Sequence, residues 1–151
     1  MDRSKQVASV MDVYKVLKNQ IQASPGTVTY QVPPAAKTQV GGGAGPVPSP
    51  LATSINTQSL VTNVFICNLH ALDSADVSID VSNYNTSSPI VTSLYSDIRI
   101  YPKNTIELTL NLTLKESDEL QVVISQVGAT TPTLHVTVFG IEMTTGNGPH
   151  A

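Results

Sequence analysis

The chain has 151 residues, with eight Lys and Arg against eleven Asp and Glu, which gives a formal net charge of −3. This length suits one domain of ordinary size, or a smaller domain with an arm. Only 13% of residues are charged, and the balance is not basic enough for nucleic acid to be the main partner. The single cysteine, Cys67, excludes an intrachain disulfide and every multi-cysteine zinc motif.

The N-terminal unit, residues 1–24, is predicted to form an amphipathic helix from about Ser4 to Gln22. Apolar residues recur there at steps of three and four, and Ala23-Ser24-Pro25-Gly26 would end the helix. An isolated helix of this length is marginal in water, so its apolar stripe needs a partner surface. That partner is the chain's own sandwich, the same helix in neighbouring subunits, or another protein. The stripe comprises Val7, Val10, Met11, Tyr14, Leu17 and Ile21.

Residues 25–53 are predicted to form an extended arm rich in glycine and proline. Residues 25–50 hold eleven of the 19 Gly and Pro residues of the chain. Proline favours extended backbone, whereas Gly41-Gly42-Gly43 is flexible. The arm is also more apolar than a free linker, with Tyr30 and Val32 among its residues. We therefore expect the arm to lie along a surface in an assembly; the alternative is a plain interdomain linker.

Residues 54–145 are predicted to form an all-β, antiparallel sandwich or jelly roll, followed by a tail at 146–151. Apolar and polar residues alternate strictly from Ile106 to Lys115, and turn signals separate further short strand-like runs. With no Trp and two Phe, the core must be aliphatic. The residues expected to face that core are Ile79, Val81, Ile106, Leu108, Leu110, Leu112, Val122, Ile124, Val136 and Val138.

No catalytic residues, metal ligands or cofactor site are predicted. His70 and His135 lie far apart in sequence without the spacing of metal ligands, and are expected to be satisfied surface residues. Glu116, Asp118 and Glu119 form an acidic turn that is expected to be solvated. No nucleophile motif is present, and the chain has no Trp to serve as a sugar platform, so an enzyme is the last of the alternatives.

The later strands resemble a known family. Tyr101-Pro102-Lys103-Asn104 leads into Ile106-Glu107-Leu108, a long strand and an acidic turn follow, and the last strand ends in Gly140-Ile141-Glu142. This order is similar to that of the small jelly-roll structural proteins of tailed bacteriophage virions, over about residues 56–143. The resemblance implies a jelly-roll fold and oligomerisation, usually as a homotrimer. It covers capsid cement, neck, tail and fibre proteins alike.

The expected function is therefore a non-enzymatic virion structural protein, made in the host cytoplasm. The favoured version is a capsid cement or decoration protein that oligomerises and anchors to the major capsid protein, or another virion protein, through its N-terminal arm. The alternatives are a neck, tail or fibre component, and a receptor- or glycan-binding module. Residues 1–37 hold five basic against two acidic residues, and the remainder three against nine, so a basic arm could dock on an acidic neighbour. No signal peptide or membrane-spanning run occurs, so no membrane partner is expected.

Overall fold

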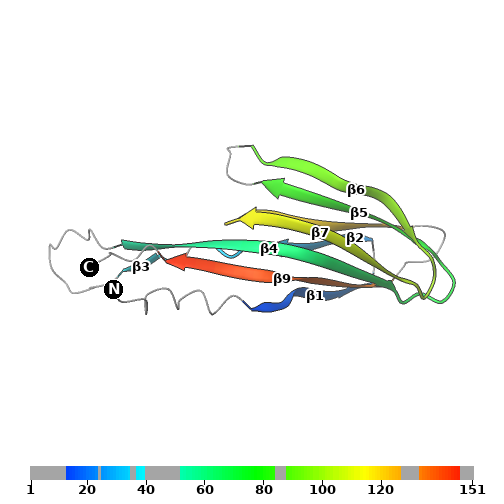
Figure 1. Ribbon diagram of the computed structural model, residues 1–151. Coiled ribbons are helices and arrows are strands. Elements are labelled where there is room, and N and C mark those ends of the chain that lie inside the picture. Colours follow the sequence, from blue (N-terminus) through cyan, green and yellow to red (C-terminus); the bar gives the residue numbers. More distant parts are fainter. Residues whose placement is uncertain are drawn as a thin grey trace.

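The computed structural model describes residues 13–23, 25–34, 37–39, 52–83, 88–126 and 133–146. These residues form nine β-strands (Figure 1), and no helix occurs among them. The strands are β1 (Tyr14–Gln22), β2 (Gly26–Gln31), β3 (Lys37–Gln39), β4 (Ala52–Asn68), β5 (Ala75–Asn83), β6 (Ile90–Ile100), β7 (Thr105–Lys115), β8 (Glu119–Gln126) and β9 (Leu134–Gly146). The all-β prediction is confirmed.

The strands form two antiparallel sheets. The first has the order β1-β9-β4-β7, with β3 pairing the N-terminal end of β4, and the second has the order β2-β8-β5-β6. Within these sheets the pairs are nested in sequence: β1 with β9, β2 with β8, β4 with β7, and β5 with β6. The chain is therefore arranged like one long hairpin that has been wrapped into two layers.

The core lies between the two sheets and consists almost entirely of aliphatic side chains. Alternation with a period of two puts every second residue of β5, β8 and β9 between the layers. The largest of the fully buried side chains come from both sheets: Ile66, Ile79, Ile100, Leu114, Leu120 and Leu134. This packing places the two sheets face to face as a β-sandwich.

Bulges interrupt three strands of the first sheet at the same level. The pairing register jumps at Leu17 in β1 and at Thr62 in β4, both opposite β9, and at Leu110 and Asn111 in β7. Asn111 has a positive φ of 48°, as an extra residue in a bulge often requires. Beside the first two bulges, β9 carries Gly140, where an added Cβ would lie 2.1 Å from the Leu60 carbonyl oxygen. Glycine is needed because the strands approach closely there.

The predicted N-terminal helix is wrong where the structure describes it. Residues 14–22 form strand β1 and pair with β9 from Tyr14–Ile141 to Gln22–Leu134. Pairing with a long buried strand satisfies the backbone and packs Leu17 against the core, which an isolated short helix would not achieve. Val7, Val10 and Met11 lie outside the described residues.

The predicted arm is also corrected in part. Gly26–Gln31 is strand β2 of the second sheet, so this stretch belongs to the sandwich and is not a tether. Lys37–Gln39 forms the short strand β3 on the end of β4. The glycine run at 41–43 lies outside the described residues. The sandwich therefore includes three strands that precede the predicted boundary at residue 54, namely β1, β2 and β3.

Candidate functional site

The two long sides of the sandwich differ. On one side the edge strands β1 and β2 contact each other, whereas the edge strands of the other side, β6 and β7, make no comparable contact. No described strand pairs with the outer edge of β6 or of β7. The ends of β5 and β6 diverge from β7 toward the β5–β6 connection (Figure 1). The sandwich is thus closed on one side and open on the other.

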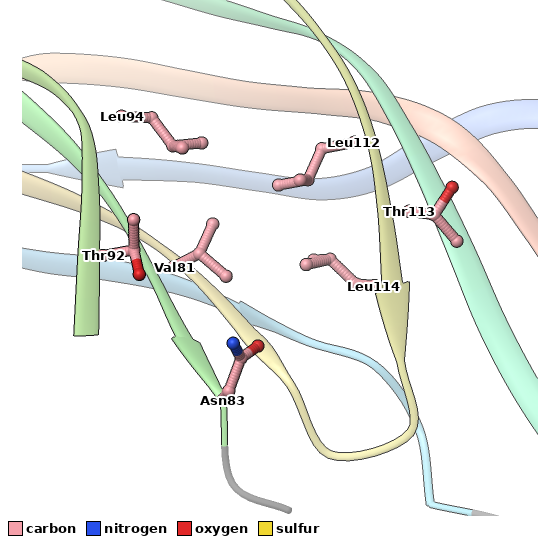
Figure 2. A pocket seen from close by; sticks show the side chains of 7 residues that line it. All are labelled: Val81, Asn83, Thr92, Leu94, Leu112, Thr113 and Leu114. Atoms are coloured by element: carbon pink, nitrogen blue, oxygen red, sulfur yellow. The ribbon is translucent and has the colours of Figure 1, made fainter. Parts of the chain in front are cut away.

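An apolar groove follows the open side. It contains a cavity of about 250 Å³ that opens to solvent. Figure 2 shows Val81 of β5 and Leu94 of β6 facing Leu112 and Leu114 of β7 across this space, with Asn83 at the end of β5. Thr92 and Thr113 complete the lining. A groove with four aliphatic side chains and few polar groups offers apolar area but no charged group for binding a polar ligand.

Strand β6 is exposed over most of its length. Residues 90–97 are all exposed, and the strand becomes buried only at Ile100. Four of the exposed side chains are large and apolar: Ile90, Val91, Leu94 and Tyr95. Exposure on both faces of an edge strand is unusual for a monomer, because it leaves apolar area and ladder hydrogen-bonding groups in water together.

A second apolar surface covers the outer face of the first sheet. Tyr14 stacks on Phe139 with ring centroids 5.9 Å apart, and Phe65 meets Phe139 edge-on at 5.4 Å. Val16, which pairs with Phe139 across β1 and β9, is 48% exposed. This aromatic patch, defined by Tyr14, Val16, Phe65 and Phe139, contains both phenylalanines of the chain.

A polar chain of hydrogen bonds closes one end of the core. The Tyr30 hydroxyl donates to Glu142 Oε1 at 2.9 Å and lies 2.7 Å from Ser59 Oγ, and Lys15 Nζ donates to Glu142 Oε2 at 2.9 Å. Burial raises the pKa of the Tyr30 hydroxyl above its usual range; the Ser59 hydrogen bond opposes this rise and Glu142 adds to it. Tyr30 therefore stays protonated and acts as a donor to Glu142, a structural role.

The other end is organised by one buried amide. Asn68 Nδ2 donates to the carbonyl oxygens of Asp73 (2.8 Å) and Ile100 (3.1 Å), and Asn68 Oδ1 accepts the His70 N–H. His70 Nδ1 in turn accepts the N–H groups of Leu72 and Asp73. The loop held in this way presents Leu72, which is 83% exposed. His70 is thus held in the loop by hydrogen bonds, and its Nδ1 lies 4.0 Å from Asp73 Oδ2.

The acidic turn between β7 and β8 differs from the prediction. Asp118 is only 5% exposed, and its Oδ2 accepts the Lys115 N–H at 3.0 Å while Oδ1 has no partner. Val32 braces the same turn, since its N–H donates to the Asp118 carbonyl oxygen and its own carbonyl oxygen accepts the Ser117 N–H. Asp118 holds the turn from inside and is not part of a solvated face.

The structure places the predicted partner-binding residues in two environments. Tyr14 and Ile21 are more than half exposed on β1, whereas Leu17 packs against the core. Tyr30 and Val32 are buried in the sandwich of their own chain. Tyr30 lies on β2 and Val32 directly follows it, and β2 and β1 are neighbouring edges of the sandwich.

The residues predicted to face the core fall into two groups. Six of them are buried: Ile79, Val81, Val122, Ile124, Val136 and Val138. The other four pack against the core but are only partly buried, and all lie on β7: Ile106, Leu108, Leu110 and Leu112. The difference follows from the open side, because no strand of the second sheet covers the inner face of β7 completely.

Among the residues that the structure describes, no three His, Cys, Asp or Glu side chains gather closely enough to hold a metal ion. His135 is hydrogen-bonded to Asn19 on the outer face of the first sheet, and it pairs with Cys67, so it lies at the same end of that sheet as His70. In the same part of the chain, no helix is long and apolar enough to span a bilayer.

Sequence reasoning missed the open side and the aromatic patch. The sequence did contain a sign of the open side: residues 90–96 mix apolar and uncharged polar side chains and include no charged one. Its exposure depends on the divergence of two edge strands, which no local pattern encodes. The patch joins β1, β4 and β9 and requires their register.

No family model matches the chain, and no curated protein sequence matches it. Among solved structures, it is similar to a chain in the structure of infectious bursal disease virus, Gx strain, with a TM-score of 0.46 and 11% sequence identity over 92% of the present chain. The present chain spans about one third of that protein's length (33%). A likeness at this identity and TM-score does not establish a shared function.

Proposed function

We propose that the chain is a non-enzymatic structural subunit of a virion that acts by packing against neighbouring proteins. The observation that carries the proposal is the nested strand pairing, β1 with β9, β2 with β8, β4 with β7 and β5 with β6. Eight strands paired in this way across two sheets make a jelly roll, an architecture that is frequent in viral capsid and lectin domains and in cupins. The step from fold to role is an analogy and needs support from the surfaces.

The surfaces of this jelly roll favour packing over ligand binding. The interior between the sheets is filled by aliphatic side chains, and the groove on the open side is lined mainly by apolar ones. The exposed β6 strand and the aromatic patch offer flat apolar area on two sides of the molecule. Such area suits contacts with other proteins, in which binding strength comes from buried surface and repeated copies.

The finer form of the proposal is a capsid cement protein of a tailed bacteriophage, as the sequence resemblance implies. The three-stranded end in which β3 and β9 flank the start of β4 supports this form. There, β4 pairs with β3 at Ala52–Gln39 and with β9 at Ile55–Gly146. In this proposal, this end replaces the predicted helical anchor as the part of the described chain that would contact a neighbour. Copies of the chain and the major capsid protein are the partners in this proposal.

The test is a decoration assay with expanded capsids of the encoding phage that lack this protein. The purified chain is added back, and bound copies are counted after sedimentation. The expected result is a saturable, stoichiometric number of copies per capsid, with rupture on heating shifted to higher temperature. Absence of binding to capsids, together with absence of the chain from purified virions, would overturn the proposal.

The same material separates the alternatives. Binding to tail or neck particles and not to capsids would replace the cement form but keep the structural role. Binding of the isolated protein to host cells or to a glycan surface would instead make it a receptor-binding module. Turnover of a substrate by the purified chain would exclude the non-enzymatic role.

A further inference from the structure

The loop that joins β4 to β5, residues 69–74, is held by an imidazole ring. It follows the end of β4 that lies away from β3 (Figure 1). His70 Nδ1 accepts the N–H of Leu72 at 3.1 Å and the N–H of Asp73 at 2.9 Å. In an Asx turn, an Asn or Asp side chain accepts the N–H two residues further along the chain. His70 takes the place of such a residue, and unlike Asn it can change its charge.

This acceptor exists only in the neutral ring. Nδ1 accepts the two N–H groups through its lone pair, so the proton of neutral His70 lies on Nε2. In the imidazolium ion both ring nitrogens are donors, and a proton on Nδ1 points at the N–H groups of Leu72 and Asp73. Both hydrogen bonds of the loop are therefore lost when His70 is protonated at Nδ1.

A partner for the protonated nitrogen lies in the same loop. Asp73 Oδ2 is 4.0 Å from His70 Nδ1, and the His70 side chain is 24% exposed, so protons from solvent reach the ring. A shift of about 1 Å brings the two atoms to the distance of a charge-assisted hydrogen bond, which is stronger than a neutral one. The loop thus has two hydrogen-bonding arrangements, and the charge of one ring decides between them.

We infer that residues 69–74 form a pH-sensitive loop. Neutral His70 holds the N–H groups of Leu72 and Asp73, whereas protonated His70 releases both and donates to the Asp73 carboxylate instead. Histidine is the side chain that ordinarily changes its charge between about pH 5 and 8, which sets the range of the change. This inference goes beyond the virion role and does not depend on it.

The change is confined to the middle of the loop. Asn68 Nδ2 donates to the carbonyl oxygens of Asp73 and Ile100, and Asn68 Oδ1 accepts the His70 N–H. None of these bonds uses a group that titrates, so both ends of the loop stay fixed. Leu72, which is 83% exposed, lies between them and loses the hydrogen bond of its own N–H. The position of an exposed apolar side chain therefore depends on pH.

The elements that pack against the loop carry few charges. The Asn68 N–H donates to the Asn104 carbonyl oxygen of the β6–β7 turn, and the Leu69 N–H donates to the Thr133 carbonyl oxygen before β9. Lys103, next to Asn104, opposes a positive charge on the ring, whereas Asp73 favours one. The other titratable or charged groups of these elements are Cys67, Asp76, Arg99, Tyr101 and His135, of which Asp76 and Arg99 form an ion pair.

The experiment is NMR of the full chain, labelled with ¹⁵N, between about pH 8 and about pH 5. The lower limit stays above the range in which carboxyl groups ordinarily titrate. At about pH 8 the ring nitrogen shifts should identify the Nε2–H tautomer of His70. On acidification, the protection factors of the Leu72 and Asp73 N–H groups against hydrogen exchange should fall about tenfold or more, with the midpoint of the His70 ring.

Three variants separate the switch from ordinary loop structure. His70→Asn keeps an acceptor for the same N–H groups but cannot be protonated, so the fall in protection should disappear while the circular dichroism spectrum is kept. Asp73→Asn removes the carboxylate that favours the protonated ring, so the midpoint should move to lower pH. His135→Gln is the matched control: it removes a histidine at the same end of the sheet and should leave the transition unchanged.

Three results would overturn the proposal. One is an Nδ1–H tautomer of His70 at about pH 8, because that ring cannot accept the two N–H groups. Another is a His70 ring that titrates while the protection of Leu72 and Asp73 stays constant. The third is a fall in protection that persists in His70→Asn. The first two are measured on the unmodified chain and need no variant to fold. Decoration of capsids is measured separately, so either proposal can fail alone.

Discussion

Replacing Gly140 with alanine tests the close approach of β4 and β9. The new Cβ would lie 2.1 Å from the Leu60 carbonyl oxygen and 2.8 Å from Leu17 Cδ1. Real contacts of this kind stay above 3.0 Å, so the Leu60 carbonyl must withdraw by at least 0.9 Å, the difference between the two distances. A ladder bond of about 2.9 Å stretched by that amount is no longer a hydrogen bond.

The cost follows from these distances. About two ladder bonds beside the contact are lost at about 1 kcal/mol each, and crowding in a packed core adds about 1–3 kcal/mol. We therefore expect Gly140→Ala to lower the free energy of unfolding by about 3–5 kcal/mol. Without a clash the sign would be opposite, because alanine is better than glycine within a strand by roughly 0.5–1 kcal/mol.

Urea unfolding followed by circular dichroism measures this change, with Leu17→Ala and the double variant Leu17→Ala/Gly140→Ala as controls. Leu17 is a flexible side chain, so its removal relieves only the 2.8 Å contact. We expect the double variant to stay at least about 2 kcal/mol below Leu17→Ala alone. A loss below about 0.5 kcal/mol for Gly140→Ala would refute the strand spacing described here.

Three further predictions concern buried polar groups. Because the pKa of Tyr30 is raised in the folded state, only the unfolded state loses this proton above about pH 10. The free energy of unfolding should therefore fall there by about 1 kcal/mol per pH unit, and Tyr30→Phe should remove this part of the fall. Urea titrations between about pH 8 and about pH 11 measure it, and equal slopes for both proteins would contradict the prediction. Asn68→Ala removes three hydrogen bonds and should cost about 2–4 kcal/mol, with faster hydrogen exchange at His70; unchanged exchange would contradict it. Asp118→Ala leaves the Lys115 N–H without its acceptor and should lower the free energy of unfolding, measured by calorimetry, by about 1–2 kcal/mol. No loss would contradict this and would mean that the backbone hydrogen bonds of Val32 alone hold the turn.

The β-sandwich could be predicted because its central strands obey a simple rule. β5, β8 and β9 keep a period of two over most of their length, so their inward residues can be read directly from the sequence. The same rule located β7, although it could not show that the inner leucines of β7 would be only partly buried. That outcome depends on the separation of β6 from β7, two edge strands of different sheets, which the sequence of neither strand encodes.

The helix prediction failed because a bulge imitates helical spacing. Tyr14, Leu17 and Ile21 stand three and four residues apart, as on one face of a helix. In β1 the register jumps between Val16 and Lys18, so Tyr14 and Ile21, seven residues apart, are both exposed, whereas Leu17 packs against the core. A bulge is set by the partner strand β9, and a single-strand pattern cannot reveal it.

The interaction surfaces were beyond the reach of sequence for a related reason. Tyr30 and Val32 looked available because the surrounding glycines and prolines suggested a tether, but pairing of β2 with β8 buries both. Ile90 and Val91 looked like ordinary sandwich residues and prove to be exposed. In each case burial is decided by which strand lies alongside, which is a long-range property.

The most direct measurement is a cryo-EM reconstruction of the phage particle that encodes this chain. We expect density for the jelly roll in many symmetry-related copies on the virion. Particles that contain no density for the chain, although infected cells produce it, would contradict a structural role in the virion.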